Sequence, residues 1–119
     1  MRHKRRVDSY NGVNVSWFNK FEKNAKLRNL EFDITMDDVL KVYLDQEKVC
    51  NLSGIPIGWI PLGKTHNISI DRVDSSKGYH MDNIQLVYPQ INMMKYRYTQ
   101  DEFIDLCRLV SKHHNNTNQ

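Results

Sequence analysis

Apolar residues recur at helical spacing near the start of the chain, and basic residues fill the positions between them. The apolar positions are Trp17, Phe18, Phe21 and Ala25. This pattern is typical of an amphipathic helix with one side in the core, and we predict it over residues 16–29. Its basic side could lie along a nucleic-acid backbone or simply contact solvent.

Two further helices are indicated by capping boxes, in which a threonine precedes an acidic residue by three positions. The pairs are Thr35 with Asp38 and Thr99 with Glu102. Such a pair satisfies the free amides at a helix start. Because an apolar stripe follows each box, we predict one helix ending near Gln46 and a C-terminal helix that packs on the core.

Between these helices the pattern changes to strands and turns. Residues 49–65 interleave Gly and Pro with apolar residues, which favours a hairpin or turn-rich ribbon. Apolar and polar residues then alternate around Ile70, and residues 74–78 close that strand. A strand over residues 83–87 and a helix opened by Pro89 follow. The predicted order is strand, loop, strand, helix.

Composition limits the class of protein. The chain has 119 residues, 39% hydrophobic and 26% charged, which suits one globular domain. No apolar run approaches the roughly 18 residues that cross a bilayer, and no signal core follows the basic start, so we expect a cytoplasmic protein without membrane contact. Cys50 and Cys107 lie far apart without CxxC spacing, which argues against a disulfide framework and a four-ligand zinc site.

Positive charge gathers at the start of the chain, although the formal net charge is only +3. The basic run consists of Arg2, His3, Lys4, Arg5 and Arg6. We interpret residues 1–14 as a phosphate-binding arm, with a solvated terminus as the alternative. Residues 15–112 then form one domain, and the polar residues 113–119 form a tail that we expect to fray.

Polar side chains gather around the two predicted strands and the helix after them. They are Asp71, Arg72, Asp74, Asn83, Asn92 and Lys95. A carboxylate at a strand end that faces a polar side chain on a helix can hold one hard divalent cation, Mg²⁺ or Mn²⁺, beside water and phosphate. The alternative is structural: the aspartates and Asn83 close turns, and Arg72 pairs with a surface carboxylate.

The same segment resembles a known family. The resemblance rests on Ser69-Ile70-Asp71-Arg72-Val73-Asp74-Ser75-Ser76-Lys77-Gly78-Tyr79, Asp82-Asn83-Ile84-Gln85-Leu86-Val87 and Ile91-Asn92-Met93-Met94-Lys95, with further similarity at residues 16–20, 50–56 and 102–104. Over roughly residues 15–110 the chain is similar to the phage-associated HNH endonucleases. The resemblance implies an α+β fold with a ββα-metal (HNH) core, flanked by two N-terminal helices and a C-terminal helix.

The resemblance also implies a function. HNH proteins of this kind are metal-dependent DNA endonucleases or nickases, which hydrolyse a phosphodiester bond to 5′-phosphate and 3′-hydroxyl ends. One unit nicks a single strand, and a pair, as in a homodimer, cuts both. The alternative is a catalytically degenerate HNH-fold module that binds DNA or a protein partner.

Roles carry over onto matching positions. Asp71 matches the aspartate that opens the motif and Asn92 its last position on the helix, so these two are the implied metal ligands. Asn83 matches the asparagine that orients the loop. Lys95 would lie near a DNA phosphate. Together with the basic arm inferred from its charge, the predicted DNA contacts are Arg2, Lys4, Arg5, Arg6, Lys77 and Lys95.

The chain departs from the family at the general base. The family places a histidine directly after the opening aspartate, whereas this chain has Arg72, and a guanidinium cannot deprotonate water. Arg72 could instead stabilise charge on the scissile phosphate. His66 and His80 are close enough in sequence to replace the base, and we favour His66.

A second departure concerns zinc, which many members bind through two CxxC knuckles. Here Ser53 follows Cys50, and Tyr88 and Ile91 occupy the second knuckle. We therefore expect no structural zinc and a buried Cys50 thiol. Apolar packing must replace the knuckles, and we expect it from Trp59, Ile60, Leu86, Val87, Phe103 and Leu106.

Overall fold

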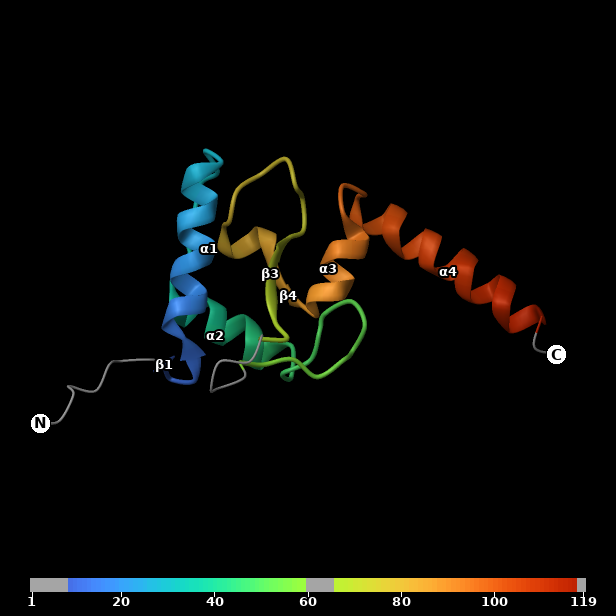
Figure 1. Cartoon of the computed structure of the whole chain (residues 1–119), viewed down its shortest axis with the longest axis horizontal. Helices are drawn as coiled ribbons and strands as arrows, with labels where there is room; N and C mark the ends of the chain where they lie inside the picture. The colour runs from blue at the N-terminus through green and yellow to red at the C-terminus, as the bar shows by residue number, and fades with distance from the viewer. Residues whose placement is uncertain (1–8, 60–65, 118–119) are drawn as a thin grey trace, which may run out of the picture.

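Helices and two small antiparallel sheets make up the computed structural model, which describes residues 9–59 and 66–117 (Figure 1). In chain order the elements are β1 (Ser9–Tyr10), β2 (Val13–Asn14), α1 (Val15–Leu27), α2 (Met36–Asp45), β3 (Ser69–Arg72), a short 3₁₀ helix η1 (Met81–Asn83), β4 (Ile84–Val87), α3 (Pro89–Lys95) and α4 (Gln100–Thr117). Within the described residues, no helix combines the length and hydrophobicity needed to cross a bilayer.

The predicted helices form, and their caps explain why. The Asn14 side chain accepts a hydrogen bond from the Trp17 amide at 2.8 Å and starts α1, one residue before the predicted start. Both hydrogen bonds of the Thr35–Asp38 capping box are present at the start of α2. The Thr99 box is also present ahead of α4.

The β1–β2 hairpin is a feature that the sequence analysis missed. It occupies residues 9–14, which we had assigned to the basic arm. Asn11 and Gly12 form its turn with positive φ angles of 51° and 96°, and Asn-Gly is the strongest short hairpin signal. Val13 is fully buried, so the hairpin belongs to the folded domain. Residues 1–8 of the arm lie outside the described part.

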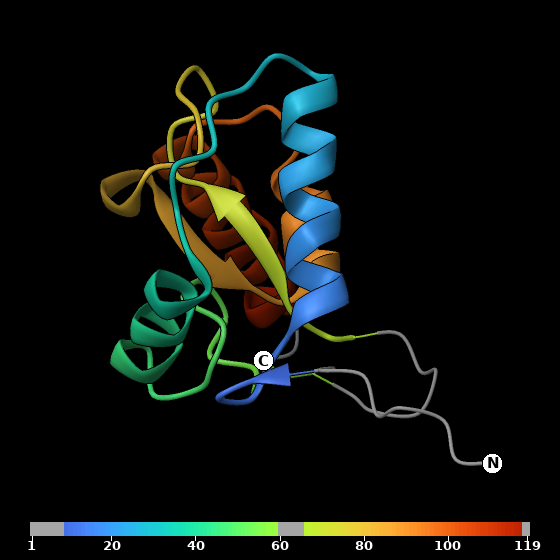
Figure 2. The same cartoon turned by 90° about the vertical axis from the view of Figure 1, so that its left-hand side faces the viewer.

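The pairing of β3 with β4 determines which side chains share each face of the sheet. Asp71 lies opposite Gln85 and Ser69 opposite Val87, while Ile70 and Leu86 pair on the other face of the sheet. Ile70 and Leu86 are both within the buried core. The sheet lies between α1 and α3 in Figure 1. Figure 2, turned by 90°, shows α1 and α2 on the near side of the sheet and α4 behind it.

The apolar packing predicted around Cys50 and the sheet is confirmed in part. Cys50 is 1% exposed and Leu86, Val87 and Phe103 are buried, as predicted. Trp59 is half-buried and contacts the rings of Trp17 and Tyr43, whereas Ile60 lies outside the described residues.

The prediction for α4 was wrong in two respects. Leu106 is 42% exposed, and Leu109 and Val110 are 64% and 63% exposed, so most of this helix does not pack on the core. It projects away from the body of the molecule (Figure 1). It also continues to Thr117, so residues 113–117 are helical rather than frayed. The apolar stripe correctly indicated a helix, but a stripe does not determine whether another element covers it.

Candidate functional site around Asp71

Asp71 lies at the centre of a buried polar network that joins β3, β4 and α3. Its Oδ2 accepts hydrogen bonds from Lys95 Nζ at 2.6 Å and from Gln85 Nε2 at 2.9 Å. Lys95 is the last residue of α3, its side chain is 4% exposed, and it also donates to the Arg72 carbonyl at 3.1 Å. The two donors, Lys95 Nζ and Gln85 Nε2, hold the carboxylate in one orientation, and Lys95 connects α3 to the sheet.

Lys95 is placed differently from our expectation. We expected it to lie near a DNA phosphate, but it is buried and ion-paired with Asp71. Burying a charge is unfavourable unless a counter-charge and hydrogen bonds compensate it, and the Lys95 ammonium has both. The other implied DNA contact within the described residues, Lys77, is exposed. Arg2, Lys4, Arg5 and Arg6 lie outside those residues.

Two amides extend the network beyond the motif. Gln85 Oε1 accepts from Asn51 Nδ2 at 2.7 Å, and Gln85 Nε2 donates to Gln100 Oε1 at 2.7 Å. The Gln85 amide therefore directs its nitrogen toward Asp71 and its oxygen toward Asn51. Through Gln85, Asn51 in the turn-rich segment and Gln100 at the start of α4 also help to orient the Asp71 carboxylate. The sequence analysis did not select these residues, although Gln85 is the one polar residue of β4.

Asn92 lies on α3 beside the same face of β3. Its Nδ2 donates to Ser69 Oγ at 2.9 Å, and Ser69 shares a strand face with Asp71 because the two are separated by one residue. Within the described residues, the hydrogen bonds leave Oδ1 of Asp71 and Oδ1 of Asn92 without a protein donor. These oxygens are the ligand type that Mg²⁺ and Mn²⁺ prefer.

The donor set for a metal is small. In the described part of the chain, no group of three or more His, Cys, Asp or Glu side chains is arranged to hold an ion. A Mg²⁺ ion commonly keeps several waters and takes only one or two carboxylates plus phosphate oxygens. Asp71 and Asn92 therefore provide two oxygen donors of the type that a Mg²⁺ site uses, and the described residues add no cluster of three His, Cys, Asp or Glu side chains to them.

Asn83 holds the loop between the strands. It is buried, its Oδ1 accepts from the Asp74 amide at 2.9 Å, and its Nδ2 donates to the carbonyls of Asp74 at 3.0 Å and Gly78 at 2.9 Å. Asp74 itself closes the turn by accepting two hydrogen bonds from Ser76, and these hold the pKa of Asp74 below its usual value. Asn83 thus lies where the resemblance implied a loop-orienting asparagine.

Arg72 also contacts this loop. Its Nη1 donates to the carbonyls of Ser75 at 2.7 Å and Lys77 at 2.9 Å, and its guanidinium lies 5.5 Å from the centre of the Tyr79 ring. Arg72 follows Asp71 on the strand, so its side chain leaves the opposite face. In this arrangement the guanidinium orders the loop rather than pairing with a surface carboxylate.

The two candidate histidines have different surroundings. His80 Nδ1 lies 2.9 Å from Asp33 Oδ2, and Nε2 lies 3.2 Å from Glu31 Oε1, so both ring nitrogens face carboxylates. His66 instead lines a groove together with Ser69, the residue that binds Asn92. His66 therefore shares a groove with the residue that binds Asn92, whereas His80 lies against Asp33 and Glu31.

The His80 contacts predict a pH-dependent stability. The hydrogen bond to Asp33 and the charges of Asp33 and Glu31 raise the pKa of His80 above its ordinary 6.5. Because the pKa is higher in the folded state, protonated His80 contributes to the free energy of unfolding. This contribution is fully present below pH 6.5 and is lost as pH rises through the folded-state pKa. We expect the urea midpoint to fall over that range, and to fall less in His80→Gln. Parallel pH profiles for the two proteins would contradict this assignment.

The fold of this chain is similar to that of a solved endonuclease structure. No protein-family model and no curated protein matches the chain. Among solved structures, that of the rare-cutting HNH restriction endonuclease PacI matches with a TM-score of 0.63, covering 98% of this chain and 93% of that chain at 19% identity. At that identity the likeness speaks for the fold. This chain therefore has the α+β fold of an HNH endonuclease, with a ββα core flanked by two N-terminal helices and one C-terminal helix.

Proposed function

We propose that this chain is a metal-dependent DNA endonuclease or nickase. The observation that carries the proposal is the arrangement of Asp71 and Asn92 on a ββα unit with the HNH endonuclease fold: Asn92 binds Ser69, which lies on the same face of β3 as Asp71. Each side chain keeps one oxygen without a protein donor among the described residues. A carboxylate and an amide oxygen suit a Mg²⁺ or Mn²⁺ ion.

In this proposal each residue of the site has a separate role in phosphodiester hydrolysis. When bound, the divalent ion supplies Lewis-acid stabilisation of the charge on the phosphate oxygens. Lys95 and Gln85 hold the Asp71 carboxylate, and Asn83 holds the loop that follows β3. His66 takes the proton of the attacking water as the new P–O bond forms. The P–O3′ bond then breaks and the leaving O3′ takes a proton from solvent water, which gives 5′-phosphate and 3′-hydroxyl ends.

A DNA-binding or partner-binding module without catalysis is the second candidate function. Two observations favour it: Asp71 Oδ2 is already occupied by Lys95 and Gln85, and Arg72 occupies the position of the family's base. The Lys95 ammonium would weaken the attraction of Asp71 for a cation. This module would bind DNA in a salt-sensitive way and would not need a metal ion.

Nicking of supercoiled plasmid separates the two candidates. We expect the purified protein to nick plasmid with Mg²⁺ or Mn²⁺ and not with EDTA. Asn92→Ala should reduce nicking to the level seen with EDTA, because it removes one of two proposed ligand oxygens. Gln90→Ala, on an exposed position of the same helix, serves as the matched control and should behave like the parent. Salt-sensitive binding without nicking under any of these conditions would establish the binding module instead.

A further inference from the structure

A groove runs between α1 and the segment that leads into β3. Its volume is about 850 Å³. The residues of its wall that bear on its chemistry are Lys20, Lys23, Asn24, His66, Ser69 and Pro89. Lys20, Lys23 and Asn24 come from α1, whereas Pro89 begins α3. The groove therefore opens between the first helix and the ββα unit.

The groove is lined by one residue that contacts a proposed metal ligand. Ser69 lines the groove and accepts the hydrogen bond from Asn92 Nδ2 at 2.9 Å. The two walls of the groove are held together, because Trp17 Nε1 on α1 donates a hydrogen bond to the Ile68 carbonyl at 3.0 Å in a buried contact. A long, thin substrate in the groove would thus be held in a constant position relative to Asn92.

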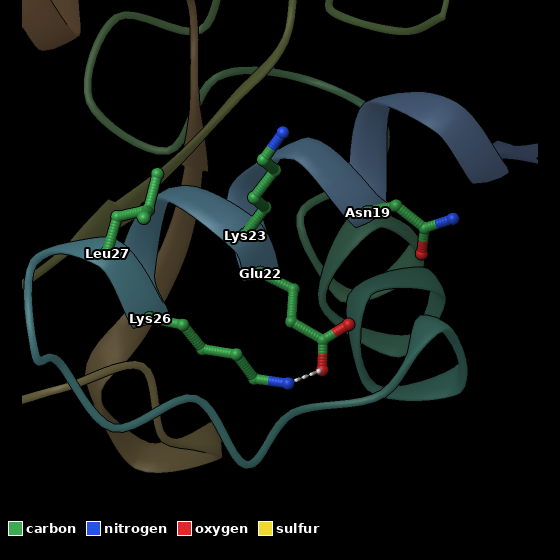
Figure 3. Close-up of a pocket in the computed structure, with 5 residues that line it drawn as sticks. All are labelled: Asn19, Glu22, Lys23, Lys26 and Leu27. Carbon is green, nitrogen blue, oxygen red and sulfur yellow. Dashed lines mark ion pairs between the residues drawn. The ribbon is translucent and has the colours of Figure 1, made fainter.

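The charge on the helix side of the groove is positive. Among the described residues, neither Lys20 nor Lys23 forms an ion pair with a carboxylate, whereas Lys26 pairs with Glu22 at 3.5 Å. Figure 3 shows this difference in an adjoining hollow that shares Lys23 with the groove: Lys23 points away from the Glu22–Lys26 pair. Both groove lysines are exposed. Their charges are available to an anion.

The spacing of the two lysines suits a chain of phosphates. Lys20 and Lys23 are three residues apart, so they share one side of α1 and rise about 4.5 Å along its axis. Lysine is a flexible point charge with three donors, which suits phosphate contacts that do not depend on base sequence. Other polar residues of the wall, among them Asn19 and Asn24, carry side chains of a type that donates to phosphate or sugar oxygens.

We propose that this groove binds the phosphodiester backbone of a DNA strand next to the bond that is cut, with Lys20 and Lys23 contacting separate phosphates. This inference rests on the proposed function, since it assigns the groove to the same substrate. It makes α1 part of the DNA-binding surface. Binding through α1 fixes the position of the strand and carries no sequence information.

The test measures binding of a fluorescently labelled DNA duplex as a function of salt, with EDTA present so that no cleavage occurs. The variant Lys20→Gln/Lys23→Gln should bind more weakly, and the slope of log K against log salt should decrease in magnitude by about two, because each lost phosphate contact contributes about 0.9. Lys41→Gln is the matched control, since this exposed lysine lies on α2 and is ion-paired with Asp45 at 2.9 Å. An unchanged slope in the double variant, or an equal change in the control, would overturn the proposal.

The result is independent of whether the protein cleaves DNA. If the salt slope of the parent depends on Lys20 and Lys23 but the parent does not nick plasmid, the groove binds DNA and the nuclease proposal is wrong. If the parent nicks plasmid but the double variant keeps the salt slope of the parent, the nuclease proposal holds and the groove is not the DNA-binding site. Urea unfolding of the double variant should match the parent, because both lysines are exposed.

Discussion

Asp71→Ala is expected to lower the free energy of unfolding by about 3 to 5 kcal/mol. The substitution removes the carboxylate that lies 2.6 Å from Lys95 Nζ and leaves the ammonium buried. An ammonium without a counter-charge is unfavourable in the interior, because the Arg72 carbonyl and neighbouring dipoles cannot replace its hydration. Urea unfolding followed by the fluorescence of Trp17 and Trp59 measures the loss.

The double variant Asp71→Ala/Lys95→Met tests the cause of this loss. Removing both charges together should restore most of the stability, since a buried ion pair can often be replaced by apolar side chains at little cost. Asp45→Ala breaks the exposed pair with Lys41 and should change stability by less than about 1 kcal/mol. The assignment fails if Asp71→Ala unfolds at the same urea concentration as the parent, or if the double variant is no more stable than the single one.

The same pair of variants separates the fold from the chemistry. A loss of nicking in Asp71→Ala alone has two explanations, an absent ligand and an unfolded chain. The double variant should be folded and still inactive, because it has no carboxylate at this position. Nicking by the folded double variant would show that Asp71 is not needed for cleavage.

His66→Ala is expected to slow nicking by about 10² to 10⁴-fold, which is the usual contribution of a positioned general base. His66 lies in the groove beside Ser69, which is hydrogen-bonded to Asn92, and Arg72 cannot accept a proton from water. Initial nicking rates at saturating metal ion, compared with binding of the same DNA in EDTA, separate a slower reaction from weaker binding.

His80→Gln is the matched control for this experiment. Both ring nitrogens of His80 face carboxylates, of Asp33 and Glu31, so we expect its replacement to leave the nicking rate close to that of the parent. If instead His80→Gln is the slow variant and His66→Ala is not, the base has been assigned to the wrong histidine.

The parts of this fold that sequence reasoning predicted are those with local signals. The caps at Thr35 and Thr99, the proline that opens α3 and the alternation around Ile70 each depend on residues close together in the chain. The β1–β2 hairpin also had a local signal, Asn11-Gly12, but the neighbouring basic run led to its interpretation as part of an arm.

The contacts around Asp71 could not be predicted in the same way. Gln85 meets Asp71 only because of the register between β3 and β4, and Gln100 reaches Gln85 only because of how α4 begins. The position of Lys95 depends on the length and direction of α3. The motif suggested a surface lysine, and tertiary structure instead turned this side chain into the counter-ion of the proposed metal ligand.

The order of synthesis along the chain determines when the Asp71 carboxylate can become oriented. This carboxylate is oriented by Lys95 directly and by Gln100 through Gln85, and both residues follow β3 in the chain, so they are synthesised after Asp71. Until that part has folded onto the sheet, β3 carries an aspartate without a fixed orientation. A growing or partly unfolded chain therefore lacks the oriented carboxylate on which the proposed metal site depends, so the proposed nuclease would be inactive until α3 and the start of α4 have folded.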